Sequence, residues 1–243
     1  EVNGRVLYPR RFDQCRRSGF ESSEVELIHF RTRMCAGQIH LLTQLPSHQT
    51  AYKLPGLLDV GKNLQCLWAG NAICGEGPYW DVGQQVLYWV DIDGCKAHRY
   101  RFQNGSVDTW KLAEKTGWLL PCAGRSELLA GCKSGVYFIG LETGMREAVI
   151  DPEPHQPNNR LNDAAVDADG RIWAGTMNDA DKIPTGWLYR IDSDLQCSTW
   201  DGPYAVTNGP AISPDGRILY HVDTHGRTVY AFDKHMDGTI DRR

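Results

Sequence analysis

The sequence lacks the features that mark several large classes of protein. It contains no uninterrupted apolar run of the roughly 18 residues that a membrane-spanning helix needs, so we expect no such helix. Its eight cysteines form no C-x-x-C pair, which argues against a zinc ribbon or a thioredoxin-like site. The formal net charge of −4 gives no sign of a nucleic-acid-binding surface. The first residues lack a basic segment followed by an apolar stretch, so we expect no signal peptide and interpret the cysteines as reduced thiols in the cytoplasm.

Two parts of the chain differ in composition and in residue pattern. Residues 1–63 are rich in arginine and show few strand-like alternations, and we predict an N-terminal extension of unknown structure there. Within it, residues 24–31 and 38–45 are each compatible with a short strand or a helix. A solvated basic tail is the preferred interpretation of the arginines, and contact with an anionic partner is the alternative. From Leu64 to Arg243, short runs of β-branched and aromatic residues alternate with Gly, Pro, Asp and Asn, which is typical of an all-β sandwich, barrel or propeller.

A repeat in this second part favours the propeller. Similar segments begin at Glu76, Asn162 and Asn208, and each is followed at the same spacing by a second strand pattern and then a third. Asn208 lies 132 residues after Glu76, which is three periods of 44, and a weaker copy fills the gap with strand patterns at 118–123, 128–132 and 136–139. A period of about 40–45 residues with four short strands is the signature of propeller blades. The Asp-Gly dipeptides at 169–170 and 215–216 share one phase, and we expect them to join the first two strands of their blades.

The number of blades follows from the same period. The residues from Glu76 to Arg243 amount to slightly less than four units of 44. We therefore predict an all-β fold over residues 64–243, an incomplete β-propeller with about four blades, whose last sheet has an unpaired edge. Most of the tryptophans fall in strand patterns and are expected to pack between blades, namely Trp80, Trp89, Trp118, Trp173 and Trp187.

The repeat phase places Glu76, Asn162 and Asn208 at equivalent positions, at the start of a blade's first strand. First strands line the central channel of a propeller, so these three side chains should meet at one mouth of it. Oxygen donors that meet from separate blades suit a hard cation such as calcium or magnesium. Taken singly, a Glu or Asn beside glycine is more often a solvated turn residue, and it is the shared phase that favours a metal site.

Three stretches resemble the regucalcin, senescence marker protein and gluconolactonase family. They are Gly75-Glu76-Gly77-Pro78-Tyr79-Trp80, then Asn159-Arg160-Leu161-Asn162-Asp163 followed by Trp173-Ala174-Gly175-Thr176-Met177, and finally Asn208-Gly209 with Ser213-Pro214-Asp215-Gly216. They occur in the family order and at the family spacing, and the resemblance covers about residues 64–243. It implies a six-bladed β-propeller, of which this chain would stop about two blades early.

The resemblance also implies roles for individual residues. Glu76 and Asn208 would be metal ligands, and Arg160 and Asn162 would contact the sugar lactone or a metal-bound water. In the related diisopropyl-fluorophosphatase type of propeller, the position like Asn162 is itself a ligand, so its role is split. Asn162 and Asp163 are the candidate catalytic residues, although Asp163 is more readily explained as a supporting or turn-forming residue. The cation would be divalent, with calcium first and zinc, magnesium or manganese as alternatives.

Two departures from the family pattern bear on these roles. The family has a third ligand, an Asp at the start of the blade after that of Asn208, which is also its proposed general base, and this blade is absent from the chain. An acidic residue that helps to bind substrate in some members has no clear register in the run from Asn178 to Asp181.

The function expected from the resemblance is metal-dependent hydrolysis of a sugar lactone, with a small-molecule substrate and no nucleic-acid or membrane partner. Three alternatives stay open. One is a calcium-binding regulator of the regucalcin type without catalysis, another is an inactive fragment, and the third is a related calcium-dependent propeller esterase or phosphotriesterase.

Overall fold

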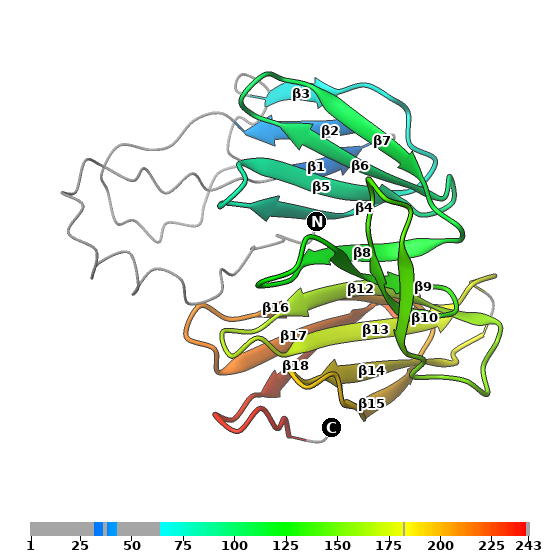
Figure 1. The fold of residues 1–243 in the computed structure, drawn as a ribbon. Coiled ribbons are helices and arrows are strands. Elements are labelled where there is room, and N and C mark those ends of the chain that lie inside the picture. Colours follow the sequence, from blue (N-terminus) through cyan, green and yellow to red (C-terminus); the bar gives the residue numbers. More distant parts are fainter. Residues whose placement is uncertain (1–31, 36–37, 43–63, 182, 242–243) are drawn as a thin grey trace.

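The computed structural model describes residues 32–35, 38–42, 64–181 and 183–241 (Figure 1). Every regular element in these ranges is a β-strand, from β1 to β18, and the strands form five antiparallel sheets. The described residues accordingly contain no long apolar helix of the kind that crosses a bilayer.

Four of the sheets follow one another along the chain as blades, and within each blade the strands pair in sequence order. The first blade consists of β4 (Gly75–Asp81), β5 (Val86–Asp91), β6 (Lys96–Arg101) and β7 (Val107–Lys111). The second consists of β8 (Thr116–Pro121), β9 (Leu128–Cys132), β10 (Gly135–Ile139) and β11 (Arg146–Ile150). The third consists of β12 (Asn159–Val166), β13 (Ile172–Asn178), β14 (Gly186–Ile191) and β15 (Cys197–Tyr204). The fourth has the three strands β16 (Thr207–Ile212), β17 (Ile218–Asp223) and β18 (Thr228–Asp233).

The prediction of an all-β, incomplete propeller with about four blades is confirmed. The weak sequence copy is the second blade, since its three expected strand patterns coincide with β8, β9 and β10. The two Asp-Gly turns join the first and second strands of the third and fourth blades, and Gly170 and Gly216 have φ angles of 83° and 76°. Such positive φ angles are accessible to glycine at no steric cost.

A fifth sheet precedes the blades and has the order β1 (Thr32–Cys35), β2 (Gln38–Leu42) and β3 (Leu64–Trp68). The pattern at 38–45 therefore forms a strand over its first residues, whereas residues 24–31 lie outside the described part of the chain. Because β2 pairs with β3, two strands from the first 63 residues extend a strand that we assigned to the second part. The boundary between 63 and 64 stays a prediction.

The first strands of the blades lie side by side around the axis, with β4 against β8, β8 against β12 and β12 against β16. Two glycines permit this close approach. A Cβ atom on Gly117 of β8 would lie 2.4 Å from the carbonyl oxygen of Asn162 on β12. A Cβ atom on Gly77 of β4 would lie 2.8 Å from the carbonyl oxygen of Gly117. The backbone of one blade thus sets the position of the next blade at the centre of the ring.

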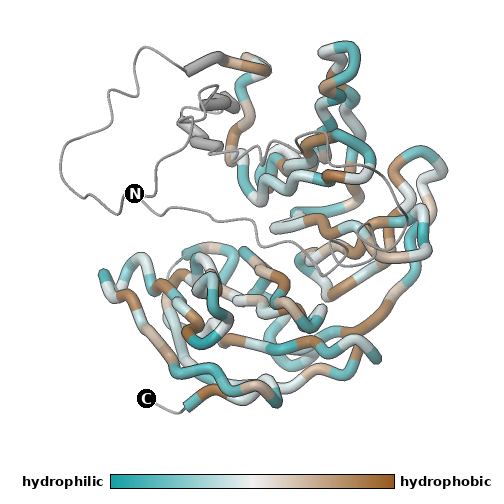
Figure 2. The backbone as a smooth tube through the Cα atoms, turned by 90° about the vertical axis from the view of Figure 1, so that its left-hand side faces the viewer, coloured by the Kyte–Doolittle hydropathy of each residue, from teal (hydrophilic) through white to brown (hydrophobic). Residues whose placement is uncertain are grey.

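Apolar side chains fill the space between neighbouring blades, and hydrophobic segments recur along the strands (Figure 2). The clusters between the first and second, second and third, and third and fourth blades are built around Tyr88 and Leu119, Trp118 and Ile172, and Trp173 and Leu219. Trp80 and Trp89 form a further cluster on the other face of the first blade. The expected packing role of the tryptophans holds for these four, and Trp187 is only partly buried.

Candidate active site at the mouth of the propeller

Each first strand carries a β-bulge near its start. The ladder to the second strand is interrupted directly after Glu76 in β4, Thr116 in β8, Leu161 in β12 and Asn208 in β16. A bulge bends the strand and re-aims the side chains beside it, and bulges are frequent next to active sites. Thr116 is the counterpart of Glu76 and Asn208 in the second blade, because each of the three is followed by glycine. This member of the set was missed from the sequence, although the Thr-Gly dipeptide at the repeat phase was the available signal.

The two asparagines that the repeat predicts to meet are in contact. The Asn162 Nδ2 atom donates to Asn208 Oδ1 at 3.2 Å and to the carbonyl oxygen of Thr207 at 2.5 Å. The Asn208 Nδ2 atom donates to Thr224 Oγ1 at 2.6 Å. Asn162 is buried, whereas Asn208 is only partly buried. The third and fourth blades are therefore linked at the mouth by amide hydrogen bonds that fix both side chains.

Arg160 lies beside the asparagine pair, one residue into β12. Its guanidinium donates from Nη1 to Asn162 Oδ1 at 2.5 Å and to the carbonyl oxygen of Leu161 at 3.2 Å. Its Nε atom forms an ion pair with Asp179 Oδ1 at 3.3 Å, and its side chain is 10% exposed. Arg160 is thus held at both ends of its guanidinium group, and its charge opposes the rise in the pKa of Glu76 that burial causes.

Two carboxyl groups, those of Glu76 and Asp163, lie within electrostatic range of each other. Desolvation raises the pKa of Glu76, against the effects of Arg160 and of the Gly77 backbone N–H, although the residue keeps exposed surface at the mouth. Desolvation and the charge of Glu76 raise the pKa of Asp163 to about 7. The Asp163 carboxylate accepts hydrogen bonds from the backbone N–H groups of Ala164 at 2.8 Å and Gly209 at 3.0 Å. Asp163 therefore ties β12 to the bulge of β16 that directly follows Asn208.

A rim of charged side chains surrounds this centre on the side of the second blade. Asp179, directly after β13, accepts from Lys115 Nζ at 2.9 Å and from Lys133 Nζ at 2.6 Å, in addition to its ion pair with Arg160. Lys115 also pairs with Asp93 at 2.9 Å. Within the acidic run, Asp179 pairs with Arg160 and Asp181 pairs with His225 at 3.2 Å. The lysines were missed from the sequence because nothing periodic connects them to Asp179.

Equivalent carboxylates in two blades hold the backbone that leads into a first strand. Asp91 ends β5 and accepts from the backbone N–H groups of Ile73, Cys74 and Gly94. Asp223 ends β17 and accepts in the same way, from Ala205, Val206 and Gly226. Burial alone would raise the pKa of both carboxyl groups. The backbone hydrogen bonds outweigh the effect of burial, so both pKa values are lowered. Each carboxylate fixes the chain that enters a first strand, and the matching sequences Tyr-Trp-Val-Asp and Tyr-His-Val-Asp are the signal that identifies the pair.

The oxygen atoms gathered at the mouth fit a hard divalent cation. Glu76 and Asp163 supply carboxylates, Asn208 supplies an amide oxygen, and such ligands suit calcium or magnesium. Desolvation, followed by repulsion from Glu76, raises the pKa of Asp163, and a cation bound nearby would relieve the repulsion. Among the described residues, no group of three or more His, Cys, Asp and Glu side chains is placed to hold a metal ion. A site here would therefore depend on the amides as well as on the carboxylates.

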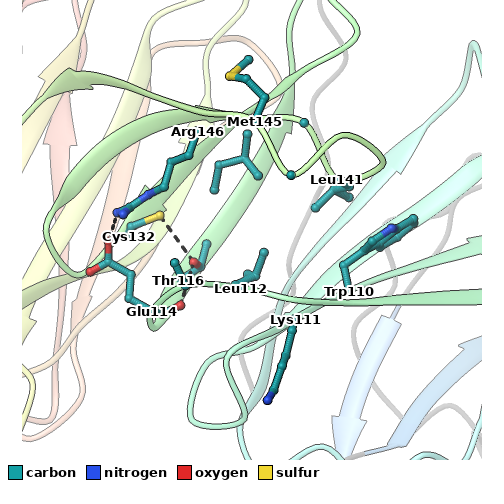
Figure 3. A pocket seen from close by; sticks show the side chains of 13 residues that line it. Trp110, Lys111, Leu112, Glu114, Thr116, Cys132, Leu141, Met145 and Arg146 are labelled. Carbon is teal, nitrogen blue, oxygen red and sulfur yellow. Dashed lines mark hydrogen bonds and ion pairs between the residues drawn. The ribbon is translucent and has the colours of Figure 1, made fainter.

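Two hollows lie near the mouth. The smaller, of about 80 Å³, lies between the first and second blades and is lined mainly by apolar side chains, with Glu114 paired to Arg146 (Figure 3). None of the predicted site residues lines it. The larger, of about 250 Å³, lies between the second and third blades, and Arg160 and Lys133 are among its lining residues. Only the larger hollow therefore adjoins the candidate site.

Comparison with known proteins decides the family. A family model described as SMP-30/Gluconolactonase/LRE-like region matches residues 74–243. The chain belongs to this family. A 6-deoxy-6-sulfogluconolactonase of Pseudomonas putida is 33% identical over 74% of this chain and 61% of its own length. The regucalcin of Oryctolagus cuniculus is 30% identical over 74% of this chain and 62% of its own length.

The solved structures agree with the family assignment. A luciferin-regenerating enzyme matches with a TM-score of 0.66 and 29% identity, over 70% of this chain and 59% of that one. The chain thus spans about three-fifths of the length of the relatives named here.

Proposed function

We propose that this protein hydrolyses sugar lactones with a divalent cation, most simply calcium, held at the propeller mouth. The observation that carries the proposal is the meeting of Glu76, Asn208, Asn162, Arg160 and Asp163 from separate blades, in a member of a family whose relatives include a named sugar lactonase. The substrate is a small molecule, and neither a nucleic acid nor a membrane is part of the proposal.

Glu76 and Asn208 are the residues proposed to hold the cation, and Asn162 lies close enough to Asn208 to join them. A divalent cation bound there would polarise the lactone carbonyl as a Lewis acid. In the hydrolysis, the oxygen of water bonds to the carbonyl carbon, the ring C–O bond breaks, and a proton ends on the released hydroxyl oxygen. The family resemblance assigns the general base and a third ligand to an Asp at the start of the blade that follows the blade of Asn208, so the proposal gives that role to none of the described residues.

The side chains of the chain itself orient the sugar. Arg160 offers guanidinium N–H donors to ring and hydroxyl oxygens, and its hydrogen bond to Asn162 holds both side chains in place before substrate arrives. Contact between Asn162 and the sugar stays a prediction, since both hydrogens of its Nδ2 atom are engaged by Thr207 and Asn208. Asp163 fixes the bulge that follows Asn208 in β16, because its carboxylate accepts a hydrogen bond from the Gly209 N–H. That Asp163 also takes part in proton transfer stays a prediction.

A reducing compartment such as the cytoplasm is the proposed location. The cysteines among the described residues, Cys66, Cys74, Cys95, Cys122, Cys132 and Cys197, are all free thiols. Unpaired cysteines in this number are usual where thiols are kept reduced.

The test is the Glu76→Gln variant, assayed for lactone hydrolysis after chelation and again after calcium is restored. We expect an activity loss of at least about 100-fold, since even the partners of metal ligands cost 10–100-fold when changed. The thermal midpoint of the wild type should rise with calcium and that of Glu76→Gln should not. Glu147→Gln, at an exposed glutamate of the second blade, is the matched control and should behave as the wild type.

The outcomes separate the alternatives. Stabilisation by calcium without turnover favours a calcium-binding protein, as the name of the regucalcin relative suggests. Neither stabilisation nor turnover favours an inactive chain. Full turnover of the metal-stripped protein would contradict the assignment of the cation site.

A further inference from the structure

The structure places an excess of positive charge at the rim of the mouth, apart from the carboxylates at its centre. Three cations, those of Arg160, Lys115 and Lys133, meet two carboxylates, those of Asp179 and Asp93. The neighbouring Glu114 does not remove this excess, because it is engaged by Arg146 and by the backbone and hydroxyl of Ser134. Within this set of ion pairs, the cations outnumber the carboxylates by one.

The two lysines are held at the surface in a fixed pair. Lys115 precedes β8 and Lys133 follows β9, and the Lys133 backbone N–H donates to the Lys115 carbonyl oxygen at 2.9 Å. Both ammonium groups converge on Asp179, yet the two side chains remain 30% and 37% exposed. An ammonium group has three donors. Lys133 uses one of them in its ion pair with Asp179. The remaining donors can reach a ligand without breaking that ion pair.

The rim is joined to the candidate site by direct contacts. Lys133 pairs with Asp179, Asp179 with Arg160, and Arg160 donates to Asn162. Lys133 and Arg160 also line the same hollow of about 250 Å³ between the second and third blades. A sugar oriented by Arg160 and Asn162 can thus extend its far end toward Lys133.

Three carboxylates line this hollow, those of Glu114, Asp151 and Glu153, and Glu153 is already satisfied by the protein. Its oxygens accept hydrogen bonds from Asn159, Thr176 and Tyr189. Burial raises the pKa of this carboxyl group, and the three hydrogen bonds oppose that rise. Beside Arg160, the hollow therefore presents one partly exposed cation, that of Lys133, and one exposed carboxylate, that of Asp151.

We infer that Lys115 and Lys133 form a subsite for an anionic group at the end of the sugar lactone remote from the ring carbonyl. The inference rests on the proposed function. The anion is of the class of sulfonates, phosphates and carboxylates, which share charged oxygens that accept hydrogen bonds from ammonium donors. Asp179 acts as a positioning residue, because its ion pairs fix the side chains of both lysines and of Arg160 relative to one another.

The experiment compares gluconolactone with its 6-phospho derivative in the wild type and in Lys133→Met. The wild type should have the higher kcat/KM for the phosphorylated lactone. Lys133→Met should lower that preference about tenfold, through KM, as expected for the loss of a charge-assisted hydrogen bond. Lys133→Arg should retain the preference. Lys111→Met, at an exposed lysine of β7, is the control and should leave it as in the wild type.

A binding measurement separates this inference from the proposed function. In the wild type, 6-phosphogluconate should raise the thermal midpoint more than gluconate does, and Lys133→Met should abolish the difference. If neither lactone is hydrolysed but this difference is seen, the proposed function fails and the anion subsite stands. If neutral gluconolactone is hydrolysed and the anionic group brings no advantage in rate or binding, the subsite is overturned. The 6-sulfo and 6-carboxyl analogues then identify which anion fits best.

Discussion

At the scale of single residues, His98 on β6 shows how burial can dominate the pKa of a side chain. Its ring stacks on Trp89 with centroids 5.0 Å apart and lies 4.6 Å from the ring of Trp68. The Nδ1 atom is 2.9 Å from Thr109 Oγ1. Desolvation lowers the pKa of His98 to about 4, because the charged imidazolium is disfavoured among these rings.

This environment predicts a loss of stability in mild acid. The folded-state pKa lies below the unfolded value of about 6.5, so the unfolded chain binds the proton more readily. The stabilising contribution is complete above pH 6.5 and is lost as the pH falls toward 4, by on the order of 1–2 kcal/mol at pH 5. Thermal midpoints of wild type and His98→Gln between pH 7.5 and 5 should show a flatter dependence in the variant. His155→Gln, at an exposed histidine, should keep the wild-type slope.

At the scale of elements, the close contact between β8 and β12 predicts that a larger residue at Gly117 destabilises the fold. Gly117→Ala places a methyl group 2.4 Å from the Asn162 carbonyl oxygen and 2.7 Å from that of Leu161, so the two strands must move apart. We expect a loss of about 1–3 kcal/mol in the free energy of unfolding, measured by urea denaturation. Activity should fall further than stability alone explains, since Asn162 is displaced. Gly83→Ala, where the nearest atom is a side-chain oxygen at 3.3 Å, is the control. Equal effects of the two variants would show that the strand contact is not tight.

The same elements show what the sequence could predict. Blades were found because Glu76, Asn162 and Asn208 repeat at one phase, and the contact between Asn162 and Asn208 follows from that phase. The second blade was weak in the sequence because its equivalent residue is Thr116, which is neither acidic nor an amide. Asp179 and Lys115 lie 64 residues apart, and their ion pair depends on how two turns meet across blades. No local pattern encodes such a contact, nor the pairing of β2 with β3.

At the scale of the whole molecule, the outer edge of the fourth blade bears on how copies of the chain associate. In the described part of the chain, the fourth blade has three strands, and β18 lies at its edge. The other three blades each have a fourth strand in the corresponding place. Unpaired N–H and C=O groups along a strand edge are a template for pairing with another chain. Val229 on β18 is 66% exposed, so this edge also offers apolar surface.

We therefore expect the chain to self-associate through β18 as its concentration rises, and Val229→Lys to reduce this association. A lysine at a strand edge opposes edge-to-edge pairing, because two copies would bring like charges together. Sedimentation velocity over a concentration series is the measurement, and the free energy of unfolding should change by no more than about 0.5 kcal/mol. Val82→Lys changes an exposed valine in the turn between β4 and β5, away from any sheet edge, and is the matched control. If both variants lower association equally, general surface charge and not the β18 edge governs it. If Val229→Lys alone does so, the edge is where a further strand or a second copy pairs.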